Sequence, residues 1–229
     1  MKGVFVTGTD TGVGKTLAAC ALVHALRARG LRVAPMKPVA AGAIATQGGW
    51  ANEDTLALAR AAGPGAPALE AITPVLLREP MAPHIAAARE GREIRLEPLL
   101  EAHRQLAPRP DFTVVEGVGG FLVPLGPSLD TRDLACALGL PVVLVVGLRL
   151  GCLNHALLTA DSVRAAGLGL AGWIANHLDP AMAAVDENVA ALAERLAAPL
   201  VGRIPHLPHV AAREAAAFLD VTALMETRA

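Results

Sequence analysis

Six short apolar runs, separated by longer segments rich in Ala, Leu, Arg and Glu, limit the folds open to this chain more than any other feature. The runs do not alternate apolar with polar residues, which is typical of strands covered on both faces. This order predicts an α/β fold, with helices on both faces of a parallel sheet. The expected strands are 3–7, 32–38, 111–116, 141–146, 170–175 and 200–204, and the expected helices are 15–29, 54–62, 96–106, 154–166, 182–197 and 211–225.

Length and composition narrow the class of protein. The 229 residues contain no repeat and no long linker, which predicts one domain over residues 1–229. Hydrophobic residues make up 53%, but the longest uncharged apolar run, 134–148, is shorter than the roughly 18 residues of a membrane span, so we expect no membrane partner. A net charge of −1 with only four Phe, two Trp and no Tyr argues against nucleic acid. The three scattered cysteines favour a reducing compartment, the cytoplasm.

The nine residues from Gly8 to Thr16, Gly-Thr-Asp-Thr-Gly-Val-Gly-Lys-Thr, follow the first expected strand and open the first expected helix. Backbone amides of such a loop bind phosphate oxygens, while Lys15 reaches the β- and γ-phosphates and Thr16 reaches Mg²⁺. The loop therefore predicts nucleoside triphosphate binding, although five residues separate the outer glycines where the common motif has four. A glycine-rich turn that binds nothing is the less favoured alternative. Asp10 is either a ligand or, in the preferred interpretation, a turn-forming residue.

Glu116 and a second lysine lie at the ends of other expected strands, and Asp54 lies at the start of an expected helix. Glu116 ends a strand, as a Walker B residue does, and the Gly117–Gly120 segment after it permits close approach to phosphate. Asp54 either caps a helix or binds metal, and the sequence favours neither. Lys37 is one of only three lysines among 20 basic residues. A retained ammonium where Arg dominates indicates a small-anion site beside a transferring phosphoryl group.

An ordered set of motifs across most of the chain resembles the dethiobiotin synthetase family. The motifs are GTDTGVGKT, MKPVAAG around Lys37, MAPHIA from Met81, VVEGVGG around Glu116, PVVLVVGLRLGCLNH from Pro141, GWIAN ending at Asn176, and GRIP ending at Pro205. The resemblance implies a homodimer of P-loop NTPase-like subunits with about seven strands. It also implies an ATP- and Mg²⁺-dependent ligase that closes a ureido ring on 7,8-diaminopelargonic acid with CO₂, through a carbamate and its phosphoric anhydride, releasing ADP and phosphate.

The resemblance also implies roles for individual residues. Thr16, Asp54 and Glu116 would bind Mg²⁺, and Lys15 and Lys37 would act in catalysis. The nucleotide would contact Thr11, Gly12, Val13, Gly14, Lys15, Thr16, Asp54, Glu116, Gly117, Val118 and Gly119, and its base would contact Asn176, Pro205, His206 and Leu207. The diamine would contact Thr11, Lys37, Ala41 and Gly119, together with Gly151, Cys152 and Asn154 of the partner subunit.

Four positions carry a further interpretation. Ala41 stands where some family members have Ser, so a hydroxyl contact is lost or supplied elsewhere. Without the resemblance, Asn154 is interpreted as a helix cap and Cys152 as a small buried hydrophobe. His84 is expected to make a structural hydrogen bond.

Two other functions remain open from the residues alone. Partition-type and cell-division ATPases resemble the predicted fold, but their loop has an additional lysine where this chain has Asp10 and Thr11. ATP-dependent amidotransferase synthetases usually carry a further glutaminase domain. Asn176-His177-Leu178-Asp179 also faintly resembles the guanine-reading motif of GTPases, which leaves the nucleotide preference open.

Overall fold

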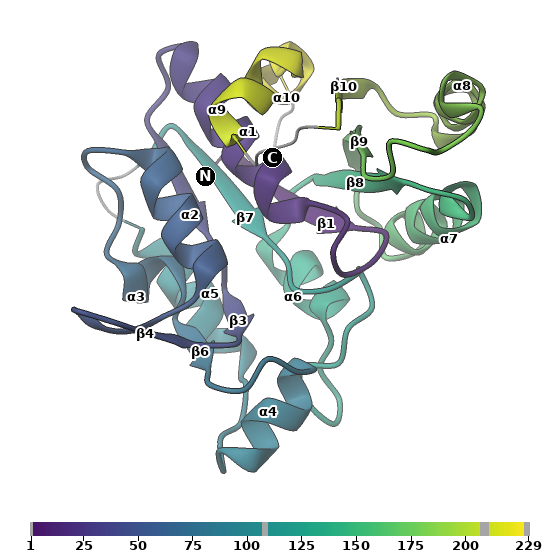
Figure 1. Cartoon of the computed structure of the whole chain (residues 1–229). Helices are drawn as coiled ribbons and strands as arrows, with labels where there is room; N and C mark the ends of the chain where they lie inside the picture. The colour runs from purple at the N-terminus through teal and green to yellow at the C-terminus, as the bar shows by residue number, and fades with distance from the viewer. Residues whose placement is uncertain (1, 107–109, 207–210, 227–229) are drawn as a thin grey trace.

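The computed structural model describes residues 2–106, 110–206 and 211–226. Six parallel strands form its main sheet in the order β10-β9-β8-β1-β7-β2 (Figure 1). All six expected strands are confirmed, with ends that differ by a few residues. Their bounds are β1 Gly3–Gly8, β2 Val33–Met36, β7 Phe112–Glu116, β8 Val142–Leu148, β9 Leu170–His177 and β10 Leu200–Ile204.

The main sheet has six strands, so the expectation of about seven was wrong. Pro38 lacks an amide hydrogen and fixes its own φ, and the Lys37 amide before it bonds Ile72 O at 2.8 Å. The chain therefore leaves the main sheet after β2. The next strand, β3 (Val39–Ala41), pairs instead with β6 (Val75–Leu77) in a separate two-stranded sheet, and β4 (Ile44–Thr46) and β5 (Gly49–Ala51) form an antiparallel hairpin.

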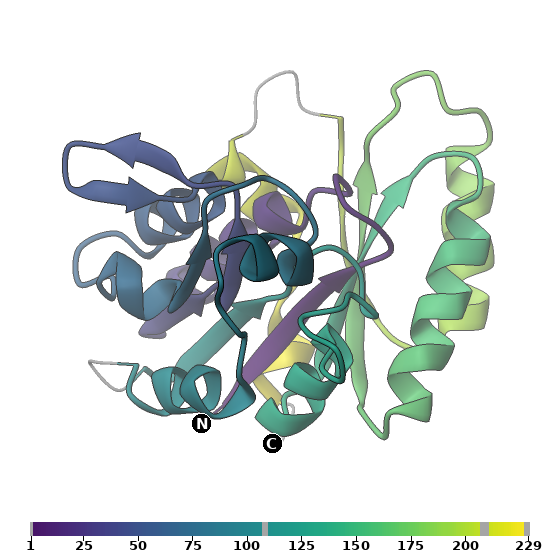
Figure 2. The same cartoon turned by 90° about the horizontal axis from the view of Figure 1, so that it is seen from below.

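Helices cover both faces of the main sheet (Figure 2). One face packs against α1 (Lys15–Ala28), α2 (Glu53–Ala62), α9 (Ala212–Ala215) and α10 (Thr222–Glu226). The other face packs against α5 (Leu96–Arg104), α6 (Thr131–Leu138), α7 (Cys152–Ala165) and α8 (Val185–Leu196). Neighbouring residues of a strand point to opposite faces of the sheet. Because helices cover both faces, the strand side chains on both are apolar, as the unalternating runs predicted.

The expected helices differ from the observed ones mainly near the end of the chain. Five are confirmed, but the expected helix 211–225 is divided into α9, the 3₁₀ turn η1 (Ala216–Phe218) and α10, because Leu219 forms an antiparallel bridge with Gly202. The short helices α3 (Leu69–Ile72) and α4 (Pro83–Arg89), and α6, were not expected. No helix within the described ranges is long and apolar enough to cross a membrane.

The sheet topology places the ends of β1, β2 and β7 at one edge. Val6 is in register with Glu116, and Met36 with Val115. Because all three strands are parallel, the phosphate loop after β1, Lys37 after β2 and Glu116 at the end of β7 emerge together.

Candidate nucleotide and metal site

The phosphate loop connects β1 to α1 and is held by a hydrogen bond from Asn176, near the end of β9. Gly14 has φ 85°, and a Cβ atom there would lie 2.1 Å from Asn176 Nδ2. That amide nitrogen donates a hydrogen bond of 2.9 Å to Val13 O. Glycine at position 14 thus allows both the left-handed turn and the close approach of Asn176.

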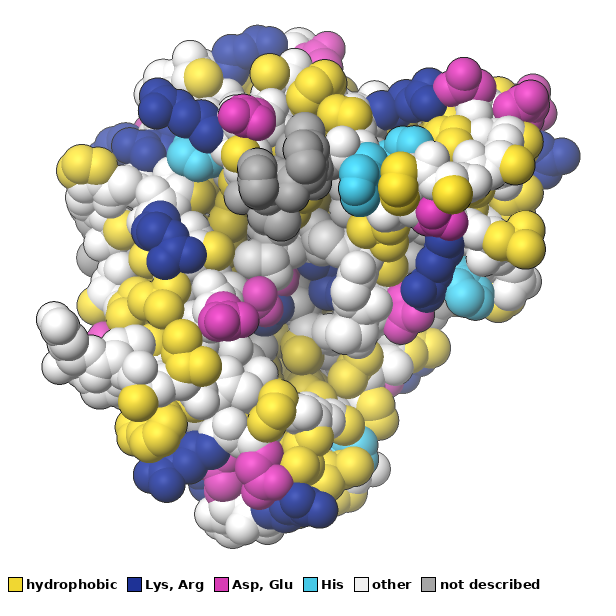
Figure 3. Space-filling view, in the orientation of Figure 1, with side chains coloured by type: hydrophobic (Ala, Val, Ile, Leu, Met, Phe, Trp, Pro, Cys, Tyr) yellow, Lys and Arg dark blue, Asp and Glu magenta, His cyan; other side chains and the backbone are white. Residues whose placement is uncertain are grey.

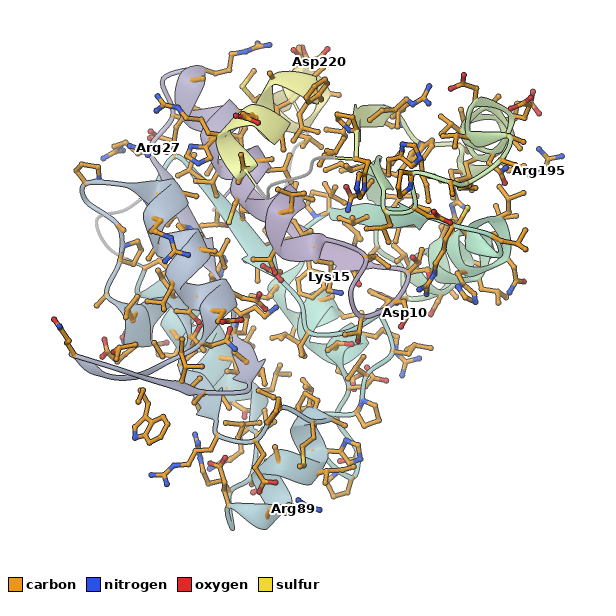
Figure 4. The ribbon with its side chains drawn as sticks, viewed as in Figure 1. Asp10, Lys15, Arg27, Arg89, Arg195 and Asp220 are labelled. Atoms are coloured by element: carbon orange, nitrogen blue, oxygen red, sulfur yellow. The ribbon has the colours of Figure 1, made fainter. Side chains whose placement is uncertain are left out.

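Lys15 begins α1 and folds back over the loop that precedes it (Figure 4). Its Nζ donates to Asp10 O at 2.7 Å. Burial and, after it, the positive charge of Lys37 lower the pKa of Lys15 to about 8. The charge of the Lys15 ammonium is therefore poorly compensated. A polyphosphate would supply negative charge, which stabilises an ammonium more than a single carbonyl dipole does.

Lys37 lies between two carboxylates that come from different elements. Its Nζ is 2.6 Å from Glu116 Oε1 and 3.0 Å from Asp54 Oδ2. Lys37 and Glu116 are 3% and 1% exposed, so the pair is shielded from water. Burial acts to lower the pKa of Lys37, but the charges of Glu116 and Asp54 outweigh it and raise that pKa. Lys37 is therefore a charged ammonium at neutral pH.

Thr16 joins the two carboxylates to the phosphate loop. Its Oγ1 is 2.8 Å from both Asp54 Oδ1 and Glu116 Oε1. Burial acts to raise the pKa of Asp54, but Lys37 and the Thr16 hydroxyl lower it overall. The structure thus brings together the hydroxyl and both carboxylates that the sequence marked as metal ligands.

Asn52, not Asp54, caps α2. Asn52 is the N-cap residue, and its Oδ1 accepts the Asp54 amide at 3.0 Å. Its Nδ2 donates to Gly42 O at 2.9 Å, which ties the start of α2 to the segment after β3. Because the cap is provided by Asn52, the Asp54 carboxylate is free to contact Thr16 and Lys37. The capping alternative for Asp54 was wrong.

The residues present fit a magnesium ion. Glu116 Oε2 is buried with no hydrogen-bond partner among the described residues, so an oxygen lone pair is available beside the Thr16 hydroxyl. The set contains only oxygen donors, and Mg²⁺ is usually bound by one or two carboxylates plus phosphate oxygens. Two carboxylates without His or Cys match that pattern, and no cluster of three or more His, Cys, Asp or Glu exists in the described part of the chain.

A cavity of about 680 Å³ extends from these groups (Figure 3). Its lining contains most of the residues that sequence analysis marked: Thr11, Gly12, Gly14, Lys15, Thr16, Lys37, Ala41, Asp54, Glu116, Val118 and Gly119. Val13, within the loop, has a buried side chain, and Gly117 is buried with its amide bonded to Val6 O at 2.9 Å.

The apolar part of the cavity lining was not expected to be functional. It is formed by Ala40, Pro80, Met81, Ala82, Pro83 and Val123. These side chains are apolar, so the cavity combines charged groups with a surface suited to an aliphatic chain. The signal in the sequence was the Met81-Ala82-Pro83 start of the MAPHIA segment, to which no contact had been assigned.

The expected base-contact residues lie outside this cavity. Asn176 is only 4% exposed and uses one amide hydrogen on the phosphate loop. Pro205 and His206 follow β10, the neighbouring strand, and His206 is exposed. Leu207 lies outside the described residues.

The other expected substrate residues form the beginning of α7, away from the cavity lining. Gly151 is the N-cap of this helix with φ 93°, so the interpretation of Asn154 as the cap was wrong, whereas Cys152 is a small buried hydrophobe as expected. The expected structural hydrogen bond of His84 is not found at Nδ1, which is buried without a partner among the described residues.

Comparison with known proteins identifies relatives over most of the chain. A family model described as "AAA domain" matches residues 2–214. The "ATP-dependent dethiobiotin synthetase BioD" of Aromatoleum aromaticum is 55% identical over 203 residues, which cover 89% of this chain and 90% of the relative. The protein of the same name from Xanthomonas axonopodis pv. citri is 54% identical over 204 residues, covering 89% and 91%.

Solved structures of lower identity share the fold. The cell division protein FtsY of Thermotoga maritima is 18% identical with a TM-score of 0.54, over 99% of this chain and 69% of its own. The septum site-determining protein MinD of Pyrococcus horikoshii, complexed with Mg-ADP, is 16% identical with a TM-score of 0.54, over 99% and 90%. At these identities the likeness supports the α/β arrangement alone.

Proposed function

The chain belongs to the ATP-dependent dethiobiotin synthetase family, and on that premise we propose that it closes the ureido ring of dethiobiotin. The substrates would be 7,8-diaminopelargonic acid, CO₂ and ATP, and the other products ADP and phosphate. The observation that supports this most is the buried Lys37 ammonium, 2.6 Å from Glu116 and 3.0 Å from Asp54, in the wall of the cavity that also contains the phosphate loop.

The proposed reaction has three steps. One amine of the substrate attacks CO₂ and loses a proton, which gives a carbamate. A carbamate oxygen then attacks the γ-phosphorus of ATP, and ADP leaves. The second amine attacks the carbonyl carbon of this mixed anhydride and loses a proton, so that phosphate leaves with the former carbamate oxygen and the ring closes.

The residues of the site would divide this work. The loop residues Thr11–Thr16, Lys15 among them, would hold the triphosphate, since Lys15 Nζ has only the Asp10 carbonyl as a hydrogen-bond partner among the described residues. Thr16, Asp54 and Glu116 would hold Mg²⁺, which when bound neutralises charge on the phosphate oxygens. Lys37 would stabilise the carbamate and the charge that develops during phosphoryl transfer. Val118 and Gly119, which line the same cavity, would approach the phosphates.

The apolar part of the cavity lining would accommodate the aliphatic chain of the diamine. Met81, Pro83 and Val123 bring hydrocarbon to the lining that also contains the charged groups. Ala41 lies in the same lining without a hydroxyl, so a contact there is restricted to its backbone and methyl group. Gly151, Cys152 and Asn154 would contact the substrate from a partner subunit, which makes the proposed active form a homodimer. The N–H groups that follow Cys152 in the first turn of α7 suit a carboxylate.

The nucleotide base would lie near the ends of β9 and β10, beside Asn176, Pro205, His206 and Leu207. We propose a cytoplasmic enzyme, which the three unpaired cysteines support.

Incorporation of radiolabelled CO₂ tests the function. We expect acid-stable label in a product that requires the diamine and MgATP together, with one ADP formed per product. Absence of that product, with ATP hydrolysis stimulated only by a protein or DNA partner, would instead support a switch of the cell-division ATPase kind.

A further inference from the structure

An ion pair connects the phosphate loop to the turn before α7. Arg149 Nη2 lies 2.6 Å from Asp10 Oδ2, across 139 residues of sequence. The other oxygen of this carboxylate, Oδ1, accepts the Thr11 amide at 2.7 Å, and the backbone carbonyl of Asp10 accepts Lys15 Nζ at 2.7 Å. Asp10 therefore accepts the amide of the next residue, not the amide two residues on that the expected turn would use, and it makes an ion pair that was not expected.

The turn that carries Arg149 is held in place by its neighbours. Leu148, at the end of β8, is 1% exposed, and Cys152 at the start of α7 is 2% exposed. The Cys152 amide donates to Arg149 O at 3.0 Å. Leu150 is 99% exposed, whereas Arg149 lies against the phosphate loop. The guanidinium thus comes from a backbone fixed on both sides, which reduces the entropy lost in forming the pair.

A carboxylate in a phosphate loop is unfavourable for a polyphosphate ligand. Asp10 lies between Gly8 and Gly12 of the loop, and its side chain is 48% exposed to solvent. Uncompensated, its charge would repel an incoming triphosphate over several ångströms. Arg149 compensates that charge through the ion pair at Oδ2, on the same residue whose backbone carbonyl bonds Lys15.

We propose that Arg149 is a positioning residue for nucleotide binding that acts through Asp10, by compensating its charge and holding its peptide against Lys15. The ligand chemistry concerned is a polyphosphate, and the inference rests on nucleotide binding by the phosphate loop in the proposed function. An exposed ion pair usually contributes little to the stability of a protein. The effect that we propose for this pair is on ligand binding, and it depends on the location of the pair in the phosphate loop.

A double-mutant cycle tests this proposal. Arg149→Ala, Asp10→Asn and the double variant are compared with the wild type by calorimetric titration of the full-length protein with MgATP and, separately, with inorganic tripolyphosphate. Arg104→Ala is the matched control, since Arg104 pairs with Glu101 at 2.6 Å on α5 and is similarly exposed. Thermal unfolding of every variant checks that it is folded, and Arg149→Lys tests rescue by a cation of another shape.

We expect Arg149→Ala to weaken the binding of both ligands about tenfold at 50 mM salt. The loss should be much smaller at 1 M salt, where charges are screened beyond about 3 Å. The double variant should recover most of the affinity, because the repelling carboxylate is gone. Arg149→Lys should be within about threefold of wild type and Arg104→Ala unchanged. The inference would be overturned if Arg149→Ala reduced the affinity equally in the wild-type and Asp10→Asn backgrounds. A reduction in affinity that is the same at 50 mM and 1 M salt would also overturn it. If the wild type bound no nucleotide, the proposed function would also fail.

Discussion

Lys37 Nζ lies 2.6 Å from Glu116 Oε1, although 79 residues separate the two in sequence. Both side chains are almost fully buried, at the ends of neighbouring strands of the main sheet. Asp54 lies on the other side of the ammonium at 3.0 Å. A buried ion pair of this kind is weak evidence for a stabilising role, because desolvation opposes the Coulomb attraction. Its position beside the phosphate loop indicates a role in binding or catalysis instead.

Lys37→Arg is expected to reduce turnover about 100-fold while the Kd for MgATP changes less than about threefold. The planar guanidinium keeps the charge that the two carboxylates require, but it cannot place a compact ammonium at the reacting anion. Nucleotide titration and single-turnover kinetics separate the two effects. Lys2→Arg, at the exposed start of the chain, is the control. Turnover within twofold of wild type would show that the shape of the cation at position 37 is unimportant.

Glu116→Gln is expected to destabilise the nucleotide-free protein by about 3 kcal/mol, because it removes one partner of a buried ion pair. It should also shift the Mg²⁺ titration of activity to higher concentrations, since a carboxylate oxygen with no hydrogen-bond partner among the described residues is lost. Urea unfolding measures the first effect. Glu101→Gln, which breaks an exposed pair on α5, should change neither quantity. An unchanged magnesium dependence would rule out Glu116 as a ligand.

Nucleotide binding at pH 8 is expected to take up about half a proton, because the pKa of Lys15 is about 8 and a triphosphate would raise it. Calorimetry in two buffers of different ionisation enthalpy measures this uptake, and Lys15→Arg should abolish it. The lowered pKa of Lys15 also determines how the free energy of unfolding changes with pH. The folded pKa lies below the unfolded value of 10.5, so the unfolded chain binds more protons between pH 8 and 10.5. Relative to Lys15→Arg, the wild type should gain stability as the pH rises through that range.

Asn176→Ala is expected to weaken the binding of inorganic tripolyphosphate as well as that of ATP, each by about five- to tenfold. The reason is that the variant loses the hydrogen bond from Nδ2 to Val13 O, which holds the phosphate loop. A residue that only reads the base would affect ATP alone. Parallel calorimetric titrations with the two ligands distinguish these roles. Asn188→Ala removes an amide on α8 that bonds Ala184 O, and it provides the control.

The main sheet and the chemistry of the site could be predicted from short-range sequence features. Unalternating apolar runs are sufficient to indicate buried parallel strands, and residues directly after such strands necessarily meet at one edge. Lys37 and Glu116 were marked in this way, and Lys15 and Thr16 by the phosphate-loop motif. The helix starts were less certain, because Asn52 and Asp54 are both good caps and only the tertiary structure shows which one is used.

What sequence analysis missed depends on contacts between distant segments. The Asp10–Arg149 pair spans 139 residues, and no local pattern links an arginine after β8 to the phosphate loop. Similarly, the apolar cavity lining at Pro80–Pro83 comes from the segment after β6 that ends at the first residue of α4. The expected helix 211–225 has good helical composition, but pairing of Leu219 with Gly202 overrides that propensity.

The path of one oxygen atom tests the central claim, that ATP phosphorylates a carbamate formed from CO₂. The enzyme is mixed with ¹⁸O-labelled CO₂, the diamine and MgATP in unlabelled water, and quenched before the label exchanges. Released phosphate is then analysed by mass spectrometry. We predict one ¹⁸O atom in each phosphate, because the carbamate oxygen that attacks the γ-phosphorus leaves with it when the ring closes. Phosphate without label, formed together with the ring-closed product, would contradict this account.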